Sequence, residues 1–122
     1  MLNWVAVFVG GGLGSLCRYS LSQYMNSTTF PWATLMANGL ACLVLGLVTG
    51  YSSRYGWSAP WKLLAATGFC GGFSTFSTFS GEAFVLGEEG LHWSALAYVF
   101  ISLFLGLSAF YIGLFWSNNN SV

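Results

Sequence analysis

A stretch that mixes phenylalanines with hydroxyl residues, GGFSTFSTFSGE at residues 71–82, holds the side chains best suited to chemistry. At helical spacing, residues three and four apart share a face, so the stretch separates into lanes. The lanes are Phe73, Phe76 and Phe79; Ser74, Ser77 and Ser80; and Thr75, Thr78 and Glu82. One short helix with this pattern places a row of rings beside a row of neutral hydrogen-bonding hydroxyls. That combination suits the handling of a small polar solute or ion.

Gly71 and Gly72 stand at the start of this stretch, inside an apolar segment. Glycine permits unusual backbone angles and close approaches, and it is unfavourable within a helix, so we expect a helix break here. In lipid, a broken backbone survives only where it is buried in protein or lines a water-filled cavity. The alternative is an unbroken helix whose hydroxyls bond to its own carbonyls. Glu82 weighs against that alternative, because intramembrane carboxylates usually serve a function.

The composition identifies the chain as an integral membrane protein. Of its 122 residues, 56% are hydrophobic and only 5% are charged, whereas about a quarter of a soluble domain is charged. A net charge of zero lacks the basic footprint that nucleic-acid binding needs. We expect a single all-α domain with about four spans, multi-pass in the inner or plasma membrane. The expected spans are residues 3–25, 32–51, 60–86 and 93–116.

The first span carries glycines and one charge. Gly10 and Gly14 have the small-residue spacing that lets another helix approach closely. The run GGGLG is not a dinucleotide loop, because Ser15 stands at the third glycine position and no strand precedes it. Two roles stay open for Arg18: its side chain reaches the headgroups, or it is an anchoring or anion-attracting charge at a pore mouth.

Isolated polar residues occur in the second and fourth spans. Asn38 is the one strongly polar side chain of the second span, so it bonds to another helix or faces water. Tyr98 and Ser102 are four residues apart in the fourth span and share a face. They either continue a hydroxyl track or bond to their own helix.

The remaining candidates for chemistry have simpler interpretations. The cysteines lie in apolar segments without a metal-ligand spacing and are expected to be small buried residues; they are Cys17, Cys42 and Cys70. Glu88, Glu89 and His92 are expected to form a solvated turn. The start of the chain lacks the basic segment of a signal peptide.

The Lys and Arg residues give only a weak preference for orientation. Four spans put Arg54 and Lys62 on the side of both termini, against none or only Arg18 on the other side. Because the positive charge of short loops sets orientation, so small a bias permits insertion in both directions and an antiparallel pair. The alternative is a single orientation with both termini inside.

Three segments together resemble the Fluc (CrcB) family of fluoride channels: GGGLGSLCRY in span one, Asn38 in span two and GFCGGFSTFSTFSGE in span three. The resemblance covers the whole chain and is most specific in span three. It implies four transmembrane helices with the third one broken, in an antiparallel dual-topology homodimer. It also implies two fluoride pathways, a central structural sodium ion, passive export of cytoplasmic fluoride, and no other cofactor.

The resemblance also implies roles for individual residues. The implied fluoride pathway consists of Phe76, Phe79, Asn38, Ser77, Thr78, Glu82, Tyr98 and Ser102. Arg18 matches the family's span-one arginine, and the sodium ion would be held by the backbone of Gly71 and Ser74. Gly106 stands where a further hydroxyl is expected in span four, so the track is shorter here or relies on water.

Physical chemistry is consistent with these roles. Fluoride is small and strongly hydrated, so a selective path must replace its water with hydroxyl and amide donors. The positive edges of aromatic rings add weaker support. Conduction also needs sites weak enough to release the ion. A hard cation such as sodium suits the free carbonyls of a broken helix.

Three other classes of protein have similar length or topology. A small proton-coupled multidrug exporter needs a carboxylate in span one, where this chain has Arg18 and no acid. A structural subunit would explain the glycine faces but give no role to the rings and hydroxyls of the third span. An enzyme is not expected, because no nucleophile, base and orienting group come together in the sequence.

Overall fold

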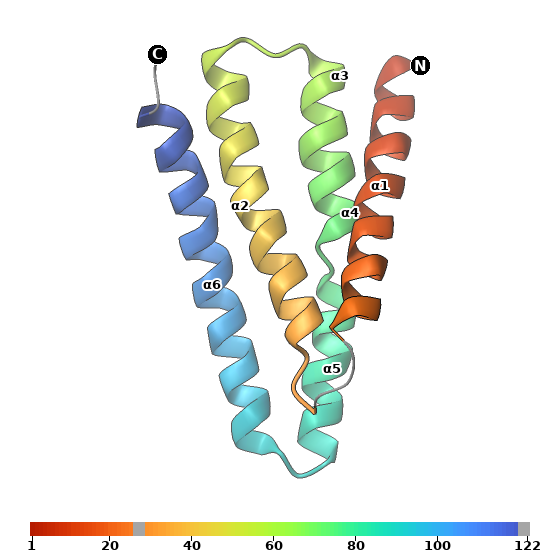
Figure 1. The fold of residues 1–122 in the computed structure, drawn as a ribbon, viewed down its shortest axis with the longest axis vertical. Coiled ribbons are helices and arrows are strands. Elements are labelled where there is room, and N and C mark those ends of the chain that lie inside the picture. Colours follow the sequence, from red (N-terminus) through yellow and green to blue (C-terminus); the bar gives the residue numbers. More distant parts are fainter. Residues whose placement is uncertain (26–28, 120–122) are drawn as a thin grey trace.

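The computed structural model describes residues 1–25 and 29–119, in which all regular secondary structure is helical. Four helical rods lie side by side (Figure 1). Three are single helices: α1 (Leu2–Tyr24), α2 (Trp32–Arg54) and α6 (His92–Asn119). The third rod is divided into α3 (Ala59–Lys62), the π-helix η1 (Leu63–Cys70), α4 (Gly71–Phe73) and α5 (Phe76–Glu88). The expected all-α fold with a broken third helix is confirmed.

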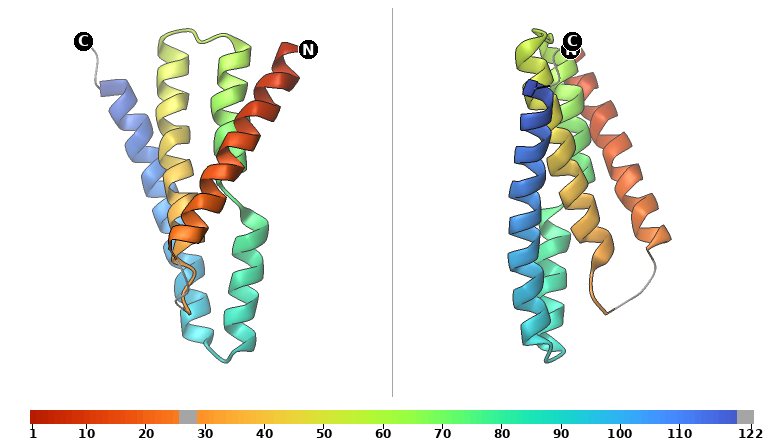
Figure 2. Two further views of the ribbon diagram at one scale, coloured as in Figure 1. Left: turned by 45° about the vertical axis from the view of Figure 1, so that its right-hand side comes forward. Right: turned by 60° about the vertical axis from the view of Figure 1, so that its left-hand side comes forward.

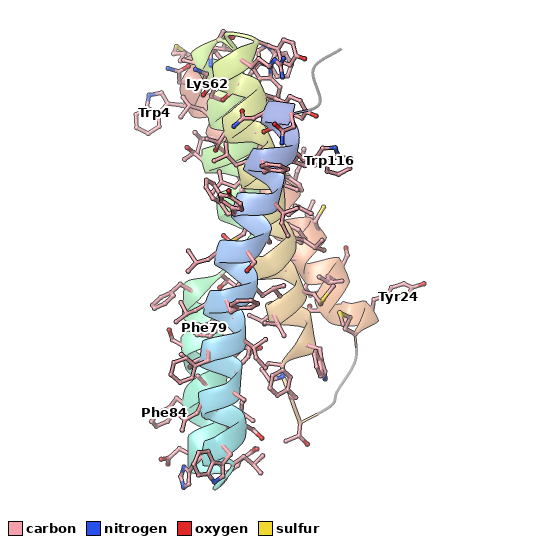
Figure 3. The ribbon with its side chains drawn as sticks, turned by 90° about the vertical axis from the view of Figure 1, so that its left-hand side faces the viewer. Trp4, Tyr24, Lys62, Phe79, Phe84 and Trp116 are labelled. Atoms are coloured by element: carbon pink, nitrogen blue, oxygen red, sulfur yellow. The ribbon has the colours of Figure 1, made fainter. Side chains whose placement is uncertain are left out.

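The two ends of the molecule differ. One end, which we call the terminal end, carries the start of α1, the end of α6 and the α2–α3 turn, while the α5–α6 turn lies at the opposite, hairpin end (Figure 1). Trp4, Lys62 and Trp116 lie towards the terminal end (Figure 3). Arg54 closes α2 at the same end and donates to the Asn118 carbonyl at 3.2 Å. Arg54 and Lys62, the last residues of α2 and α3, therefore lie at the same end of the molecule.

Among the described helices, α2 and α6 are each long and apolar enough to cross a bilayer. The third rod is apolar too, but its break leaves α5 with only 13 residues. It needs both halves to span the hydrocarbon core, since about 20 helical residues are required. The exact membrane boundaries within these rods stay a prediction.

Glycines allow close backbone contacts between the rods. A Cβ atom added to Gly10 would collide with the Leu64 carbonyl, and one added to Gly14 would collide with the Phe69 carbonyl, so α1 lies directly against η1. In the same way Gly46 of α2 lies against the Phe110 carbonyl of α6. The close-packing faces expected from glycine spacing are confirmed. The rods therefore pack as two pairs: α1 packs against η1 and α4, and α2 packs against α6 (Figure 2).

The break lies after the two glycines and not at them. Gly71 has ordinary helical angles, φ −65° and ψ −37°, whereas Ser74 and Thr75 are extended, with ψ of 158° and 116°. Gly72 serves a different need, because a Cβ there would collide with the Gly11 carbonyl. Gly72 is therefore needed for a close contact between helices. The break lies a few residues after the glycines, so its expected position was wrong.

The ring lane is interrupted for the same reason. Phe73 ends α4 and is buried against Ala37 and Ala41 of α2, while Phe76 begins α5. The side chain of Phe76 is 78% exposed in the single chain. Phe73 and Phe76 thus lie in different helices, and the expectation of one short helix with three aligned rings was wrong. Only Phe76 and Phe79 form a pair, with ring centroids 5.8 Å apart.

Candidate functional site

Asn38 holds the break in the third rod. Its Oδ1 accepts a hydrogen bond from the Thr75 N–H at 2.7 Å, and its Nδ2 donates to the Thr75 carbonyl at 3.2 Å. The side-chain amide therefore satisfies both polar groups of one extended residue. Of the two roles open to Asn38, bonding to another helix is the one seen here, and its side chain also borders a pocket.

Thr75 in turn starts α5. Its Oγ1 accepts from the Thr78 N–H at 3.2 Å, which is the usual bond of a helix N-cap. The same Oγ1 lies 3.0 Å from Thr78 Oγ1 and 3.3 Å from Ser77 Oγ. Two of the hydroxyls predicted for the fluoride pathway, those of Ser77 and Thr78, therefore gather around Thr75 and are exposed in the single chain.

These bonds leave two carbonyls without their helical donors. In a continuous helix the Gly71 carbonyl would accept from Thr75 N, and the Ser74 carbonyl from Thr78 N. Thr75 N instead donates to Asn38, and Thr78 N donates to Thr75 Oγ1. Gly71 is also exposed, with no atom within 4 Å of the position of a Cβ. The two carbonyls predicted to hold sodium are thus among those that lose their helical donors at the break, and carbonyl oxygen suits a hard cation.

Arg18 turns towards the broken rod. Its Nε donates to the Gly72 carbonyl at 3.1 Å, and Ser15 Oγ lies 3.5 Å from the same oxygen. Arg18 also lines a pocket of about 300 Å³, which we call the arginine pocket. Its other lining residues are Ser15, Tyr19, Ser22, Ala33, Thr34, Thr75, Thr78 and Glu82. The side chain therefore anchors α1 to α4 and places a positive charge beside the hydroxyls at the break.

Glu82 joins three rods. Its Oε1 accepts from Thr34 Oγ1 of α2 at 2.9 Å, and its Oε2 accepts from Tyr98 OH of α6 at 2.8 Å. Tyr98 is fully buried, at 0% exposure, and its ring centroid lies 5.0 Å from that of Phe79. Two hydroxyl donors thus hold the carboxylate, and one of them belongs to the tyrosine that contacts Phe79.

Phe76 and Phe79 border a second pocket, which we call the ring pocket, of about 410 Å³. Asn38 and Ser102 line it together with Cys42, Ser74, Thr75, Leu103, Gly106, Leu107 and Phe110. The Oγ of Ser102 is buried and has no hydrogen-bond partner among the described residues. Ser74 is satisfied differently, because its Oγ donates to the Cys70 carbonyl at 2.8 Å. The alternative considered from the sequence was a hydroxyl that bonds to a carbonyl of its own helix. It therefore holds for Ser74 and not for Ser102.

The structure brings all the predicted residues to the region of the break and α5, but sequence reasoning missed Thr34. This residue precedes Asn38 by four positions, so both side chains lie on the same face of α2. A hydroxyl one turn from the only amide of a charge-free span was the available signal. The sequence also gave Thr75 a place in a lane of side chains, whereas its main contribution is the cap of α5.

Comparison with known proteins gives one consistent family. Residues 5–114 match the family described as CrcB-like protein, Camphor Resistance (CrcB). The chain is 38% identical to the "Fluoride-specific ion channel FluC" of Phocaeicola vulgatus over 120 residues, covering 96% of this chain and 99% of the relative. It is 42% identical to the protein of the same name from Oceanobacillus iheyensis, covering 93% and 89%. Flavobacterium psychrophilum has another at 41%, covering 88% and 90%.

These matches decide between the classes considered from the sequence. Both the family match and the curated relatives extend over nearly the whole chain, so the agreement does not depend on one motif. Because the relatives are named as ion channels, they do not support the alternatives of an enzyme or a multidrug exporter. The chain is a membrane protein with transmembrane helices, and it belongs to the CrcB/FluC family.

Proposed function

We propose that this protein is a fluoride-specific ion channel that lets cytoplasmic fluoride leave the cell by passive diffusion. The names of its relatives support the substrate. The residues of the site support the mode of transport, because they offer many neutral donors around one strongly held carboxylate. Weak, repeated sites allow an ion to leave as easily as it binds, which conduction requires.

The observation that carries this proposal is the hydroxyl of Ser102, which has no hydrogen-bond partner within residues 1–25 and 29–119. A buried polar group without a partner is costly, so its presence beside a pocket indicates a ligand or water there. The pocket also holds the ring pair of Phe76 and Phe79 and the amide of Asn38. Hydroxyl, amide and ring edges are the donors expected to replace the hydration shell of a small anion.

The proposed pathway continues from the ring pocket along α5. Phe79 contacts Tyr98, whose hydroxyl donates to Glu82, and Thr78 lies one turn before Glu82. The hydroxyls of Ser77 and Thr78 lie on the exposed start of α5. Fluoride would give up its water molecules step by step and bind these donors instead. Arg18 lies beside the path and attracts anions without blocking it, because its Nε is engaged by the Gly72 carbonyl.

A second copy of the chain would complete the channel. Phe76 is 78% exposed in the single chain, and the redirected bonds at the break leave Gly71 and Ser74 carbonyls available. Two copies related by a two-fold axis in the membrane plane would bring both features to the centre and form two pathways. The small difference in loop charge permits the antiparallel insertion that such a dimer needs.

Sodium fits at the centre of that dimer. The carbonyls of Gly71 and Ser74 from two copies would offer oxygen ligands without any charged side chain. Bound there, sodium would supply a positive charge that joins the two broken helices, and it would not itself be transported. No cofactor besides this structural ion is expected.

The test is fluoride efflux from liposomes that contain the purified protein, measured with a fluoride electrode and with chloride as the control anion. We expect rapid fluoride efflux and little chloride efflux. Phe76→Ile and Phe79→Ile should each abolish fluoride efflux, because isoleucine keeps an apolar side chain but has no ring edge to meet the ion.

Phe84→Ile is the matched control. Phe84 lies on the same helix and is 68% exposed, but it borders neither the ring pocket nor the arginine pocket. Its replacement should leave efflux at the wild-type rate, and all three variants should keep the wild-type elution volume in detergent. Undiminished efflux in both Phe76→Ile and Phe79→Ile would remove the ring pair from the pathway, and absence of fluoride efflux in the wild type would overturn the function.

A further inference from the structure

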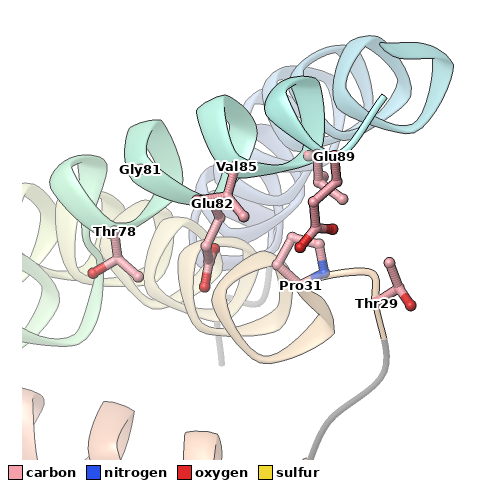
Figure 4. A pocket seen from close by; sticks show the side chains of 8 residues that line it. Thr29, Pro31, Thr78, Gly81, Glu82, Val85 and Glu89 are labelled. Atoms are coloured by element: carbon pink, nitrogen blue, oxygen red, sulfur yellow. The ribbon is translucent and has the colours of Figure 1, made fainter. Parts of the chain in front are cut away.

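A pocket of about 680 Å³ runs along α5 towards the hairpin end of the molecule. Five of its lining residues are spaced by one, three or four positions on α5 and so form one face of that helix; they are Thr78, Gly81, Glu82, Val85 and Leu86, and the C-cap residue Glu89 also lines the pocket. Thr29 and Pro31, just before α2, form the opposite wall (Figure 4). We call this feature the α5 trough.

The inner end of the trough leads to the proposed pathway. Thr78 and Glu82 line both the trough and the arginine pocket. Glu82 is also bonded to Tyr98, which contacts Phe79. The outer end is marked by Glu89, whose side chain lies on the trough side of α5 (Figure 4). The trough therefore extends from the arginine pocket, at Thr78 and Glu82, to Glu89 near the hairpin end.

The trough carries uncompensated negative charge at its outer end. Glu82 is held by two hydroxyl donors, whereas Glu89 is an exposed carboxylate. Glu89 is also the C-cap of α5, where the helix dipole has its negative end. The basic residues Arg54 and Lys62 lie at the opposite, terminal end. An anion at this mouth therefore meets repulsion rather than attraction.

We propose that Glu89 is a rate-setting charge of the channel, which lowers the local concentration of fluoride at the mouth of the α5 trough. This inference rests on the proposed function and adds a residue to it. Glu88 has the same charge and is also exposed, but it does not line the trough. His92, the first residue of α6, does not line it either. The effect should thus depend on the position of the carboxylate and not on the net charge of the chain.

The magnitude follows from the screening of charges in water. One unit charge about 4 Å away changes the local ion concentration by a factor of about five in water at low salt. The Debye length falls from about 30 Å at 0.01 M salt to about 3 Å at 1 M salt, which removes most of that effect. The influence of Glu89 should therefore be large in dilute salt and small in concentrated salt.

The experiment compares Glu89→Gln with Glu88→Gln in planar bilayers. Single-channel fluoride currents are recorded at low fluoride concentration, in sodium isethionate of about 0.01 M and then about 1 M. We expect Glu89→Gln to raise the current about two- to fivefold in dilute salt, and Glu88→Gln to raise it by much less. Glu89→Lys should raise it further. In concentrated salt all four proteins should carry similar currents.

The outcomes separate this inference from the function on which it rests. If the wild type carries no fluoride current, the proposed function fails. If the wild type conducts but Glu89→Gln equals Glu88→Gln in dilute salt, Glu89 has no special role and the inference is overturned. The same conclusion follows if the gain of Glu89→Gln persists unchanged in concentrated salt, because a charge effect must be screened.

Discussion

Asn38 and Thr75 form a two-point pair in which the side-chain amide of α2 bonds to both the N–H and the carbonyl of the extended residue at the break. The pair lies where the third rod lacks helical backbone hydrogen bonds of its own. It explains how an extended residue can exist inside an apolar protein, because both backbone polar groups of Thr75 are satisfied by a neighbouring helix.

The first prediction concerns this pair. Asn38→Leu leaves the Thr75 N–H and carbonyl unsatisfied in a part-buried site, so we expect a loss of about 1–3 kcal/mol of stability. Thermal unfolding in detergent should show a lower midpoint, and fluoride efflux should fall because the start of α5 shifts.

Thr49→Val is the control for that measurement. Thr49 lies on the same helix, but its hydroxyl bonds only to the Leu45 carbonyl of its own turn, at 2.7 Å. We expect a change of a few tenths of a kcal/mol at most, since such local bonds add little to stability. A midpoint for Asn38→Leu equal to that of Thr49→Val would contradict the role of the pair.

The second prediction concerns the carboxylate that joins three rods. Tyr98→Phe and Thr34→Val each remove one hydrogen bond to Glu82, and each should cost about 1.5–3 kcal/mol because the acceptor is a carboxylate. The double variant should differ from the sum of the single ones, because both donors share one acceptor. Unfolding midpoints are measured in detergent for the wild type, the two single variants and the double variant. The differences between them give the coupling energy. Tyr111→Phe, at an exposed tyrosine of α6, is the control, and strict additivity would argue against a shared site.

The third prediction concerns the contact of α1 with η1. Gly14→Ala should push the two rods apart, because its Cβ would collide with the Phe69 carbonyl, and backbone cannot move aside cheaply. We expect a loss of about 1–3 kcal/mol or failure to purify as a single species. Gly12→Ala is the matched control, since no atom lies within 4 Å of its Cβ position. Equal behaviour of the two variants in size-exclusion chromatography and thermal unfolding would contradict the packing.

The fourth prediction concerns the proposed sodium ion. Exchange of sodium for N-methylglucamine on both sides of the membrane should lower fluoride efflux, because the Gly71 and Ser74 carbonyls would then repel each other across the dimer. Return of sodium should restore the rate. Efflux that is the same with and without sodium, after complete exchange confirmed by elemental analysis, would show that the site is not needed for transport.

Part of the fold could be predicted because apolar length and glycine spacing act locally. Four apolar segments specify helices in a membrane protein whatever their partners, and Gly10 with Gly14 marks a face that needs a close neighbour. The position of the break could not be obtained in this way. Gly71 and Gly72 suggested it, but the bonds that stabilise extended Ser74 and Thr75 come from Asn38, 37 positions away from Thr75.

The sequence by itself determined the family, the membrane setting and the chemical character of the site, because residue types and their spacing carry that information. Only the tertiary structure decided which groups meet: Glu82 with Thr34 and Tyr98, Asn38 with Thr75, and Ser102 with no hydrogen-bond partner in the described part of the chain. The physical reason is that a hydrogen bond between rods depends on their relative rotation and depth. Close backbone contacts at glycines set the rotation and the depth of each rod. The residue pattern within one segment contains no information on either.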